Sequence, residues 1–324
     1  IMNWLTSKIQ SFVEKAKQTF KRQRPSKEDQ ENSLWLNCPG CNQMQLREDL
    51  KKNFNVCKCQ YHFDLDPKTR FDKLIFDSDY HLIPCPKFAN PDPINFVING
   101  KKAIDKYRNY QKKTGQESAI LIAAGKMNGL NVVCAGYNFS FGASTVSLRE
   151  SEHLLAGMQY ALDKKVDCFI SFYCSGGMDV KGNLFSLTKG MSAVILAMNE
   201  LKRKNILTVG VLSSKSTGGL FVDTFANDTL WSESKTSNNL LFSGKRVSAG
   251  VRSSDQEEMP ADYGEGQALT RNGMIDGYFN SRLEIKDKLS TLIKVLLKKP
   301  TAESIVEENS NVSVEPSLAK KLPL

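Results

Sequence analysis

Four cysteines near the start of the chain have a spacing that suits a metal site. Cys38 and Cys41 are separated by a Pro-Gly turn, and Cys57 and Cys59 follow after fifteen intervening residues. Four thiolates gathered in this way can close a tetrahedral Zn²⁺ site with bonds of about 2.3 Å. We therefore predict one structural zinc ion bound by these four cysteines, against the alternative of reduced, metal-free thiols.

The second cysteine pair is less regular than the first. Only one residue separates Cys57 from Cys59, so in an extended segment the two side chains would point to opposite faces unless the chain bends. His62, three residues after Cys59, is an alternative fourth ligand. No open set of histidine and carboxylate ligands accompanies the cysteines, which argues against a catalytic zinc site.

Two glycine pairs stand at the ends of predicted strands. Gly176 and Gly177 precede a long helical stretch, and Gly218 and Gly219 precede a short one. Glycine pairs in such places let the backbone approach a ligand and aim N–H groups at a developing negative charge, although each pair could also be an ordinary tight turn. Neither pair matches a phosphate-binding glycine pattern, and no serine or cysteine lies in a recognisable nucleophile elbow.

The elements that must position these residues follow from the apolar periodicity. Strand-like apolar runs alternate with segments of helical spacing, a pattern typical of an α/β domain with buried strands. The predicted strands are residues 119–124, 130–135, 166–174 and 206–212, and the predicted helices are residues 101–113, 150–163, 184–204 and 285–297.

Composition limits the class of protein. With 324 residues and 40% hydrophobic content, the chain is long enough for about two domains. No apolar run reaches the roughly 18 residues of a membrane span. The net charge of +9 is compatible with an anionic ligand but does not identify which one. Cys134, Cys168 and Cys174 lie in apolar, strand-like surroundings where cysteine commonly serves as a small hydrophobic residue. Together with the predicted metal cluster, they favour a reducing compartment over a disulfide framework.

The two ends of the chain differ from its middle. The spacing of apolar and basic residues over positions 4–20 predicts a basic amphipathic helix. Such a helix could bind a membrane surface, act in targeting, or pack on the rest of the protein or on a partner. We predict a helix and linker over residues 1–34, a zinc ribbon over 35–65, a large α/β domain over 66–299 and a disordered tail over 300–324.

The collinear order of short motifs resembles one family, the β subunit of the carboxyltransferase of multi-subunit acetyl-CoA carboxylase. Beside the cysteines and glycine pairs, the motifs that carry this resemblance are Met2-Asn3-Trp4-Leu5, Asp92-Pro93-Ile94-Asn95-Phe96, Lys106-Tyr107, Thr114-Gly115, Asn138-Phe139, Phe242-Ser243-Gly244-Lys245-Arg246-Val247 and Gly273-Met274-Ile275-Asp276. The resemblance implies an N-terminal zinc ribbon followed by a crotonase-like domain.

The same resemblance implies an activity. Such a subunit works with a carboxyltransferase α subunit and with biotin on a separate biotin carboxyl carrier protein, and transfers CO₂ to acetyl-CoA to give malonyl-CoA for fatty-acid synthesis. It implies that the N–H groups of Gly176 and Gly177 stabilise the thioester enolate, and that four further residues bind substrate, namely Ser175, Gly218, Gly219 and Arg246. The implied compartment is bacterial cytoplasm or plastid stroma, with the mitochondrion left open.

The chain departs from the family pattern at two motifs, and its fourth cysteine is shifted by a one-residue deletion. Where the family usually reads FMGGSMGS, residues 139–146 read FSFGASTV, and the Ala-Arg-Met that follows the serine and two glycines is Met-Asp-Val, with Asp179 in place of the cation. A second hypothesis is therefore a catalytically degenerate subunit that acts as a scaffold. A zinc-ribbon nucleic-acid binder comes third, because it leaves the large α/β domain unexplained.

Overall fold

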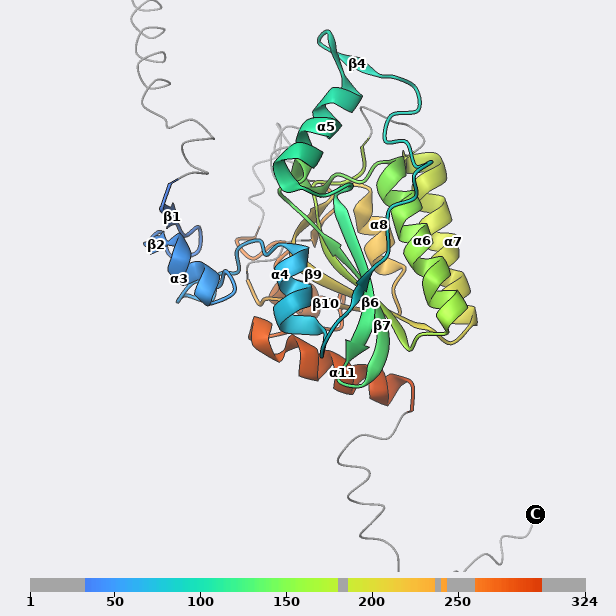
Figure 1. Ribbon diagram of the computed structural model, residues 1–324. Helices are drawn as coiled ribbons and strands as arrows, with labels where there is room; N and C mark the ends of the chain where they lie inside the picture. Colours follow the sequence, from blue (N-terminus) through green and yellow to red (C-terminus); the bar gives the residue numbers. More distant parts are fainter. Residues whose placement is uncertain (1–32, 180–185, 237–239, 244–259, 299–324) are drawn as a thin grey trace, which may run out of the picture. The chain divides into compact units, whose positions relative to one another are not determined.

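The computed structural model describes four stretches of the chain, residues 33–179, 186–236, 240–243 and 260–298. The chain divides into two compact units, Ile1–Tyr61 and His62–Leu324 (Figure 1). The predicted basic helix of residues 4–20 and the predicted tail of residues 300–324 lie outside the described residues. Within the described part, no helix combines the length and apolar character that a membrane crossing requires.

The described part of the first unit is a short hairpin followed by one helix. β1 (Trp35–Asn37) pairs antiparallel with β2 (Met44–Leu46), and α3 (Arg47–Lys52) follows directly. The turn of the hairpin holds the first cysteine pair, and the segment after α3 holds the second. Because so short a segment buries little apolar surface, a bound metal is the usual source of stability for such a unit.

The second unit is built on a twisted mixed sheet in the order β12-β10-β9-β8-β7-β6-β3, with β11 paired to β9. Strands β7, β8, β9, β10 and β12 run parallel, whereas β6 and β3 are antiparallel to their neighbours. The strands are β3 (His81–Leu82), β6 (Ile120–Met127), β7 (Leu130–Tyr137), β8 (Cys168–Ser175), β9 (Leu207–Thr217), β10 (Thr229–Ser232), β11 (Leu240–Leu241) and β12 (Gly277–Tyr278). A separate hairpin joins β4 (Val97–Ile98) to β5 (Lys101–Lys102).

Helices cover both faces of this sheet. On one face, α6 packs so closely on β6 that a Cβ at Gly157 would lie 2.9 Å from Ile122. On the opposite face, a Cβ at Gly136 of β7 would lie 2.7 Å from Pro67 of α4 and 3.1 Å from Phe71. Figure 1 shows α6 and α7 together, away from α4 and α11. The helices are α4 (Pro67–Arg70), a π-helix (Phe71–Ile75), α5 (Ala103–Thr114), a 3₁₀ turn (Gly142–Ser144), α6 (Leu148–Lys164), a π-helix (Ser186–Met191), α7 (Ser192–Arg203), α8 (Leu220–Phe225), α10 (Gly266–Arg271), a 3₁₀ turn (Arg282–Glu284) and α11 (Ile285–Leu296).

The α/β prediction is confirmed, with informative differences at element ends. The four predicted strands are β6 to β9, and the predicted helices are α5, α6, α7 and α11. β9 continues to Thr217 because its polar end is buried: the Ser213 hydroxyl donates to the Tyr173 carbonyl at 3.0 Å, and the Ser214 hydroxyl donates to Asp64. The helix predicted over 184–204 is described as a π-helix leading into α7.

Candidate functional site

The four predicted metal ligands come together in the first unit. The sulfur atoms of Cys38, Cys41, Cys57 and Cys59 all lie within 4.8 Å of one another, with Cys38 Sγ 3.6 Å from Cys59 Sγ and Cys41 Sγ 3.8 Å from Cys57 Sγ. A tetrahedral ion with bonds of about 2.3 Å requires sulfur separations of about 3.8 Å. The donor set therefore fits one four-coordinate metal ion.

Local backbone geometry explains how a pair separated by one residue serves this cluster. Gln60 has a positive φ of 67° and its N–H donates to the Cys57 carbonyl at 2.8 Å, so the chain turns back after Cys59 instead of extending. At Gly40 a Cβ would lie 3.0 Å from the Tyr61 side chain and 3.3 Å from Cys59 Sγ. The tight turn of the first pair thus needs glycine to leave room for the second pair.

His62, the alternative ligand, contacts a different group. Its side chain is buried, and its Nδ1 lies 3.7 Å from Glu233 Oε1. The Glu233 carboxylate also pairs with Arg70 at 2.8 Å and with the Arg282 guanidinium. Burial alone would raise the pKa of the Glu233 carboxyl, but the Arg282 and Arg70 charges outweigh it and hold that pKa well below its usual range. This buried ionic cluster had no signal in the linear sequence.

The two glycine pairs also come together, at the carboxyl ends of neighbouring parallel strands. Gly176 and Gly177 follow β8, Gly218 and Gly219 follow β9, and Ser175 is in register with Ser216. A Cβ at Gly177 would lie 3.0 Å from the Thr217 carbonyl oxygen and 3.4 Å from the Gly218 Cα. The two turns therefore contact each other through backbone atoms alone. They lie at the carboxyl ends of parallel strands, where ligands bind in many α/β sheets.

Both predicted oxyanion donors already make hydrogen bonds inside the protein. The Gly176 N–H donates to the Ala143 carbonyl at 2.8 Å, and the Gly177 N–H donates to Ser175 Oγ at 3.0 Å. The Ser175 hydroxyl in turn donates to the Ser144 carbonyl at 2.6 Å. A ligand oxygen would have to replace these acceptors. Arg246, the other predicted substrate-binding residue, lies outside the described residues.

The segment that departs from the family pattern lies directly beside the glycine turns. Gly142, Ala143 and Ser144 all have positive φ, at 60°, 60° and 51°. Phe141 is buried, with its ring centroid 5.0 Å from that of Tyr107 and 5.6 Å from that of Tyr110 on α5. Aromatic bulk thus attaches α5 to this loop at a place where the resemblance expected glycine.

A buried acid lies on α8, immediately after the second glycine pair. Asp223 is 2% exposed, and its Oδ1 makes no hydrogen bond within the described part of the chain. Burial raises the pKa of this carboxyl to about 7. Sequence reasoning missed Asp223 because an acid in a short amphipathic helix is usually solvated; only the tertiary structure shows that it faces inward.

Comparisons with known proteins agree with the motif order. No protein-family model matches the chain. The acetyl-coenzyme A carboxylase carboxyl transferase subunit beta of Pelagibacter ubique is 28% identical over 320 residues, covering 98% of each chain. The protein of the same name from Agrobacterium fabrum is 29% identical over 301 residues, covering 92% of this chain and 95% of its own.

Solved structures support the fold. A transcarboxylase 12S structure superposes with a TM-score of 0.57 at 15% identity over 76% of this chain, which spans 42% of that longer chain. A Pseudomonas malonate decarboxylase hetero-tetramer superposes with a TM-score of 0.55 at 14% identity, covering 78% of this chain and 92% of the other. The chain therefore has a crotonase-like domain and a cluster of four cysteines that can hold a metal ion, and over nearly its whole length it resembles the beta subunit of acetyl-CoA carboxylase carboxyl transferase.

Proposed function

We propose that this chain is the β subunit of an acetyl-CoA carboxylase carboxyltransferase, which transfers CO₂ from carboxybiotin to acetyl-CoA and gives malonyl-CoA for fatty-acid synthesis. The observation that carries this proposal is the similarity to subunits of that name over 98% of the chain. The meeting of the two glycine turns at the carboxyl ends of β8 and β9 supports it, because that geometry brings unshielded backbone to one place.

For this reaction the chain must position the substrates and stabilise the negative charge that develops on the thioester oxygen. Carboxybiotin, on a separate biotin carboxyl carrier protein, supplies the CO₂ and a nitrogen that can take the acetyl proton. In this proposal the N–H groups of Gly176 and Gly177 exchange their acceptors, the Ala143 carbonyl and Ser175 Oγ, for the enolate oxygen of the thioester. Hydrogen bonds to a charged oxygen are roughly twice as strong as those to neutral acceptors, which favours the exchange only once the enolate forms.

The proposal also names the metal, the partners and the compartment. The tetrahedral sulfur set suits structural Zn²⁺. A carboxyltransferase α subunit would supply the binding site for the biotin carbonyl, and the isolated chain is expected to be inactive. Because the similar proteins from Pelagibacter ubique and Agrobacterium fabrum are bacterial, we expect bacterial cytoplasm or, by descent, plastid stroma, with the mitochondrion as a third compartment.

The test is a malonyl-CoA assay on the purified chain with an α subunit, carboxybiotin donor and acetyl-CoA. Turnover that needs both subunits supports the proposal. Turnover from this chain alone contradicts the proposal that the α subunit supplies part of the active site. An absence of turnover while the α subunit is tightly bound contradicts the enzymatic role of this chain.

Two observations favour a second candidate, a catalytically degenerate scaffold. Both proposed oxyanion donors are satisfied internally, and Asp179 places an anion where the family pattern has a cation. If the parent binds an α subunit but is inactive and Asp179→Arg restores turnover, the scaffold is the correct description. If the parent is active and Asp179→Asn changes little, it is not.

A further inference from the structure

Two hairpins of the second unit turn on the same dipeptide. Asn99-Gly100 joins β4 to β5, and Asn128-Gly129 joins β6 to β7. The backbone is nearly identical at both, with φ of 49° and 75° in the first turn and 47° and 79° in the second. Positive φ at both residues of a two-residue loop defines a type I′ turn, for which Asn-Gly is a preferred sequence. Because sequence and backbone are matched, a difference in reactivity between the two turns must come from their surroundings.

Asn-Gly is also the dipeptide in which an asparagine side chain reacts most easily with its own main chain. The glycine nitrogen, after losing its proton to water, forms a bond to the asparagine Cγ; the Cγ–Nδ2 bond breaks, and the Nδ2 group takes a proton from water and leaves as ammonia. Water then opens the resulting cyclic imide. Opening at Cγ gives aspartate, and opening at the main-chain carbonyl carbon gives isoaspartate. Glycine favours the reaction because it has no Cβ to obstruct the attacking nitrogen.

The turn between β6 and β7 is held against this reaction. The Asp77 carboxylate accepts the Asn128 N–H at 2.9 Å and the Gly129 N–H at 3.0 Å, so the nitrogen that would attack is engaged with an anion. The Asn128 side chain donates to Asp287 and to Ser290, each at 2.9 Å. The adjoining strands pair over eight residues each within the large sheet. Ring closure requires the glycine nitrogen to rotate toward Cγ, and this turn can rotate only by giving up these bonds.

The turn between β4 and β5 lacks these restraints within the described part of the chain. Asn99 and Gly100 are exposed, and no described residue makes a hydrogen bond with the Asn99 side chain or with the Gly100 N–H. A Cβ added at Gly100 would meet nothing within 4 Å. The two strands pair over two residues each and form a sheet of their own. So small a hairpin is marginally stable, and its turn can open and rotate at little cost.

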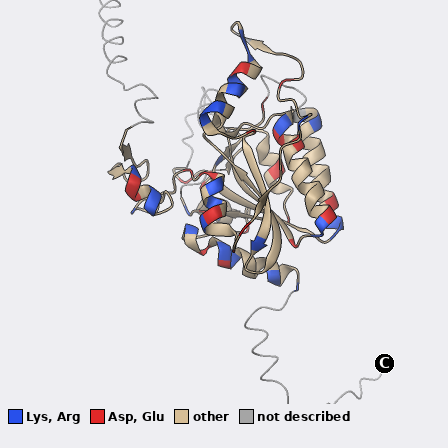
Figure 2. Ribbon diagram, in the orientation of Figure 1, with Lys and Arg blue, Asp and Glu red and all other residues tan. Residues whose placement is uncertain are grey.

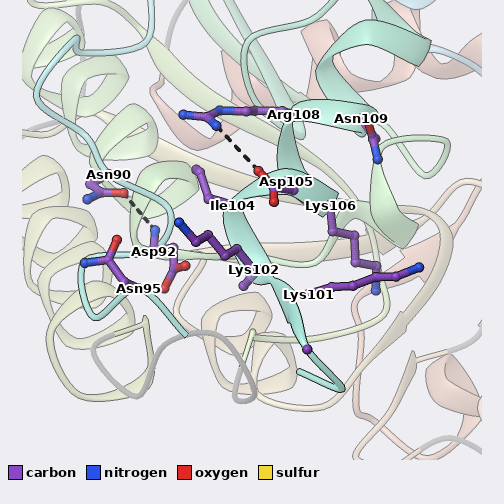
Figure 3. A pocket seen from close by; sticks show the side chains of 12 residues that line it. Asn90, Asp92, Asn95, Lys101, Lys102, Ile104, Asp105, Lys106, Arg108 and Asn109 are labelled. Atoms are coloured by element: carbon purple, nitrogen blue, oxygen red, sulfur yellow. Dashed lines mark hydrogen bonds and ion pairs between the residues drawn. The ribbon is translucent and has the colours of Figure 1, made fainter. Parts of the chain in front are cut away.

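Charge around the two turns acts in the same direction. Figure 3 shows Lys101 and Lys102 directly after the first turn, and both are exposed. Figure 2 shows further basic residues along α5. The attacking nitrogen is an anion, which nearby cations stabilise. The second turn instead faces the carboxylates of Asp77 and Asp287, the first of which pairs with Lys286 at 2.6 Å.

We propose that Asn99 is a site of spontaneous modification, at which the Asn99-Gly100 turn converts to aspartate and isoaspartate while Asn128-Gly129 stays intact. The inference does not depend on the carboxyltransferase reaction. The product carries a new carboxylate close to Lys101 and lowers the net charge of +9 by one unit. In the isoaspartate form the main chain is one carbon longer, so the turn no longer matches its strands. The modification changes both the charge and the strand pairing of the hairpin that leads into α5.

The first experiment follows the full chain in mildly alkaline buffer by peptide mapping with mass spectrometry. Isoaspartate is identified separately by transfer of a labelled methyl group with an isoaspartate methyltransferase. The rate at each site in the folded chain is divided by its rate in denaturant, which removes the effect of flanking residues. We expect this ratio to be about tenfold or more higher at Asn99 than at Asn128, the scale of one hydrogen bond to a charged acceptor. Equal ratios, a higher ratio at Asn128, or no conversion at Asn99 would overturn the proposal.

Two variants test the cause of the difference. Asn99→Gln should remove the main acidic species of the folded chain, because the longer side chain would have to close a larger ring. Asp77→Asn removes the anion that holds both N–H groups of the second turn. It should raise the rate at Asn128 several-fold and leave the rate at Asn99 unchanged. An Asn99→Gln chain that acidifies as fast as the parent contradicts the assignment of Asn99, and an Asp77→Asn chain in which Asn128 is still protected contradicts its structural basis.

Discussion

Replacing Gly176 or Gly177 with alanine adds the same methyl group at two adjacent positions, but only the change at Gly177 should be costly. At Gly177 the backbone has φ of +114°, a conformation that L-residues rarely adopt, and the new Cβ would lie 3.0 Å from the Thr217 carbonyl oxygen. At Gly176 the nearest atom to a new Cβ would be the Ala143 Cβ at 3.4 Å, an ordinary van der Waals contact. The two variants therefore differ in backbone strain and share the same chemical change.

The magnitude follows from these contacts. An L-residue forced into a left-handed conformation costs about 1–2 kcal/mol, and the Thr217 carbonyl cannot retreat without disturbing the end of β9. We expect Gly177→Ala to lower the free energy of unfolding by about 2–3 kcal/mol, or the Tm by about 5–10 °C for a domain of this size. Gly176→Ala should stay within about 0.5 kcal/mol of the parent.

The assay combines thermal unfolding with turnover in the presence of an α subunit. Gly176→Ala keeps its N–H in place and should remain within a few-fold of the parent, whereas Gly177→Ala should lose about 10²-fold in kcat, the scale for displacing an oxyanion donor. Valine at Gly177 would add further strain, so alanine is the sharper probe. Equal Tm and equal kcat for the two alanine variants would refute the geometry argued for this turn.

Three further predictions concern the metal cluster and the buried charges. Elemental analysis should find one zinc per chain, lost in Cys59→Ser but kept in His62→Ala; the reverse pattern would make His62 the fourth ligand. Glu233→Gln should destabilise the domain by about 3–5 kcal/mol, because it leaves the buried arginines without a counter-charge. The pKa of Glu233 is lowered in the folded protein, so the stability that its carboxylate contributes is present above the ordinary glutamate pKa and is lost as the pH falls through the pKa of the folded state. Chemical denaturation should therefore show acid sensitivity in the parent that Glu233→Gln lacks. Asp223 has its pKa raised to about 7, so the parent should lose up to about 4 kcal/mol of stability as the pH rises from about 4 to about 7; denaturant unfolding of Asp223→Asn should not show this loss, and parallel pH profiles would contradict the burial argument.

The sequence was sufficient for features that depend on local pattern. Apolar runs predicted β6 to β9 because strands buried on both faces need continuous apolar residues. The spacing of Cys38 and Cys41 predicted a metal cluster because two ligands on one turn need a fixed short separation. The sequence placed the glycine pairs at the carboxyl ends of two predicted strands, where the structure has them, but it did not predict that the two turns would touch.

Features that depend on residues far apart in the chain could not be predicted. The Glu233 cluster joins Arg70 to Arg282, and nothing in the surroundings of any one of them differs from a solvated charge. The occupied N–H groups of Gly176 and Gly177 were equally hidden, because their acceptors are set by the fold of the 139–146 loop and by a rotamer of Ser175. Hydrogen bonds of this kind are tertiary facts with no linear signature.

These occupied donors do not weigh against catalysis as heavily as a simple count of hydrogen bonds suggests. Each internal bond to a neutral acceptor contributes about 0.5–1.5 kcal/mol, whereas a bond to a charged oxygen contributes about 1.5–3 kcal/mol, so the exchange favours the enolate. The acceptor of Gly176 also belongs to a strained segment: Ala143 and Ser144 both have positive φ, at about 1–2 kcal/mol each. Movement of the Ala143 carbonyl away from Gly176 could release part of that strain and so offset the lost bond. Ala143→Gly, which relaxes the segment without touching the donor, should therefore stabilise the resting protein and slow turnover if the strain assists opening; a variant that is more stable with unchanged kcat would show that the strain has no part in the reaction.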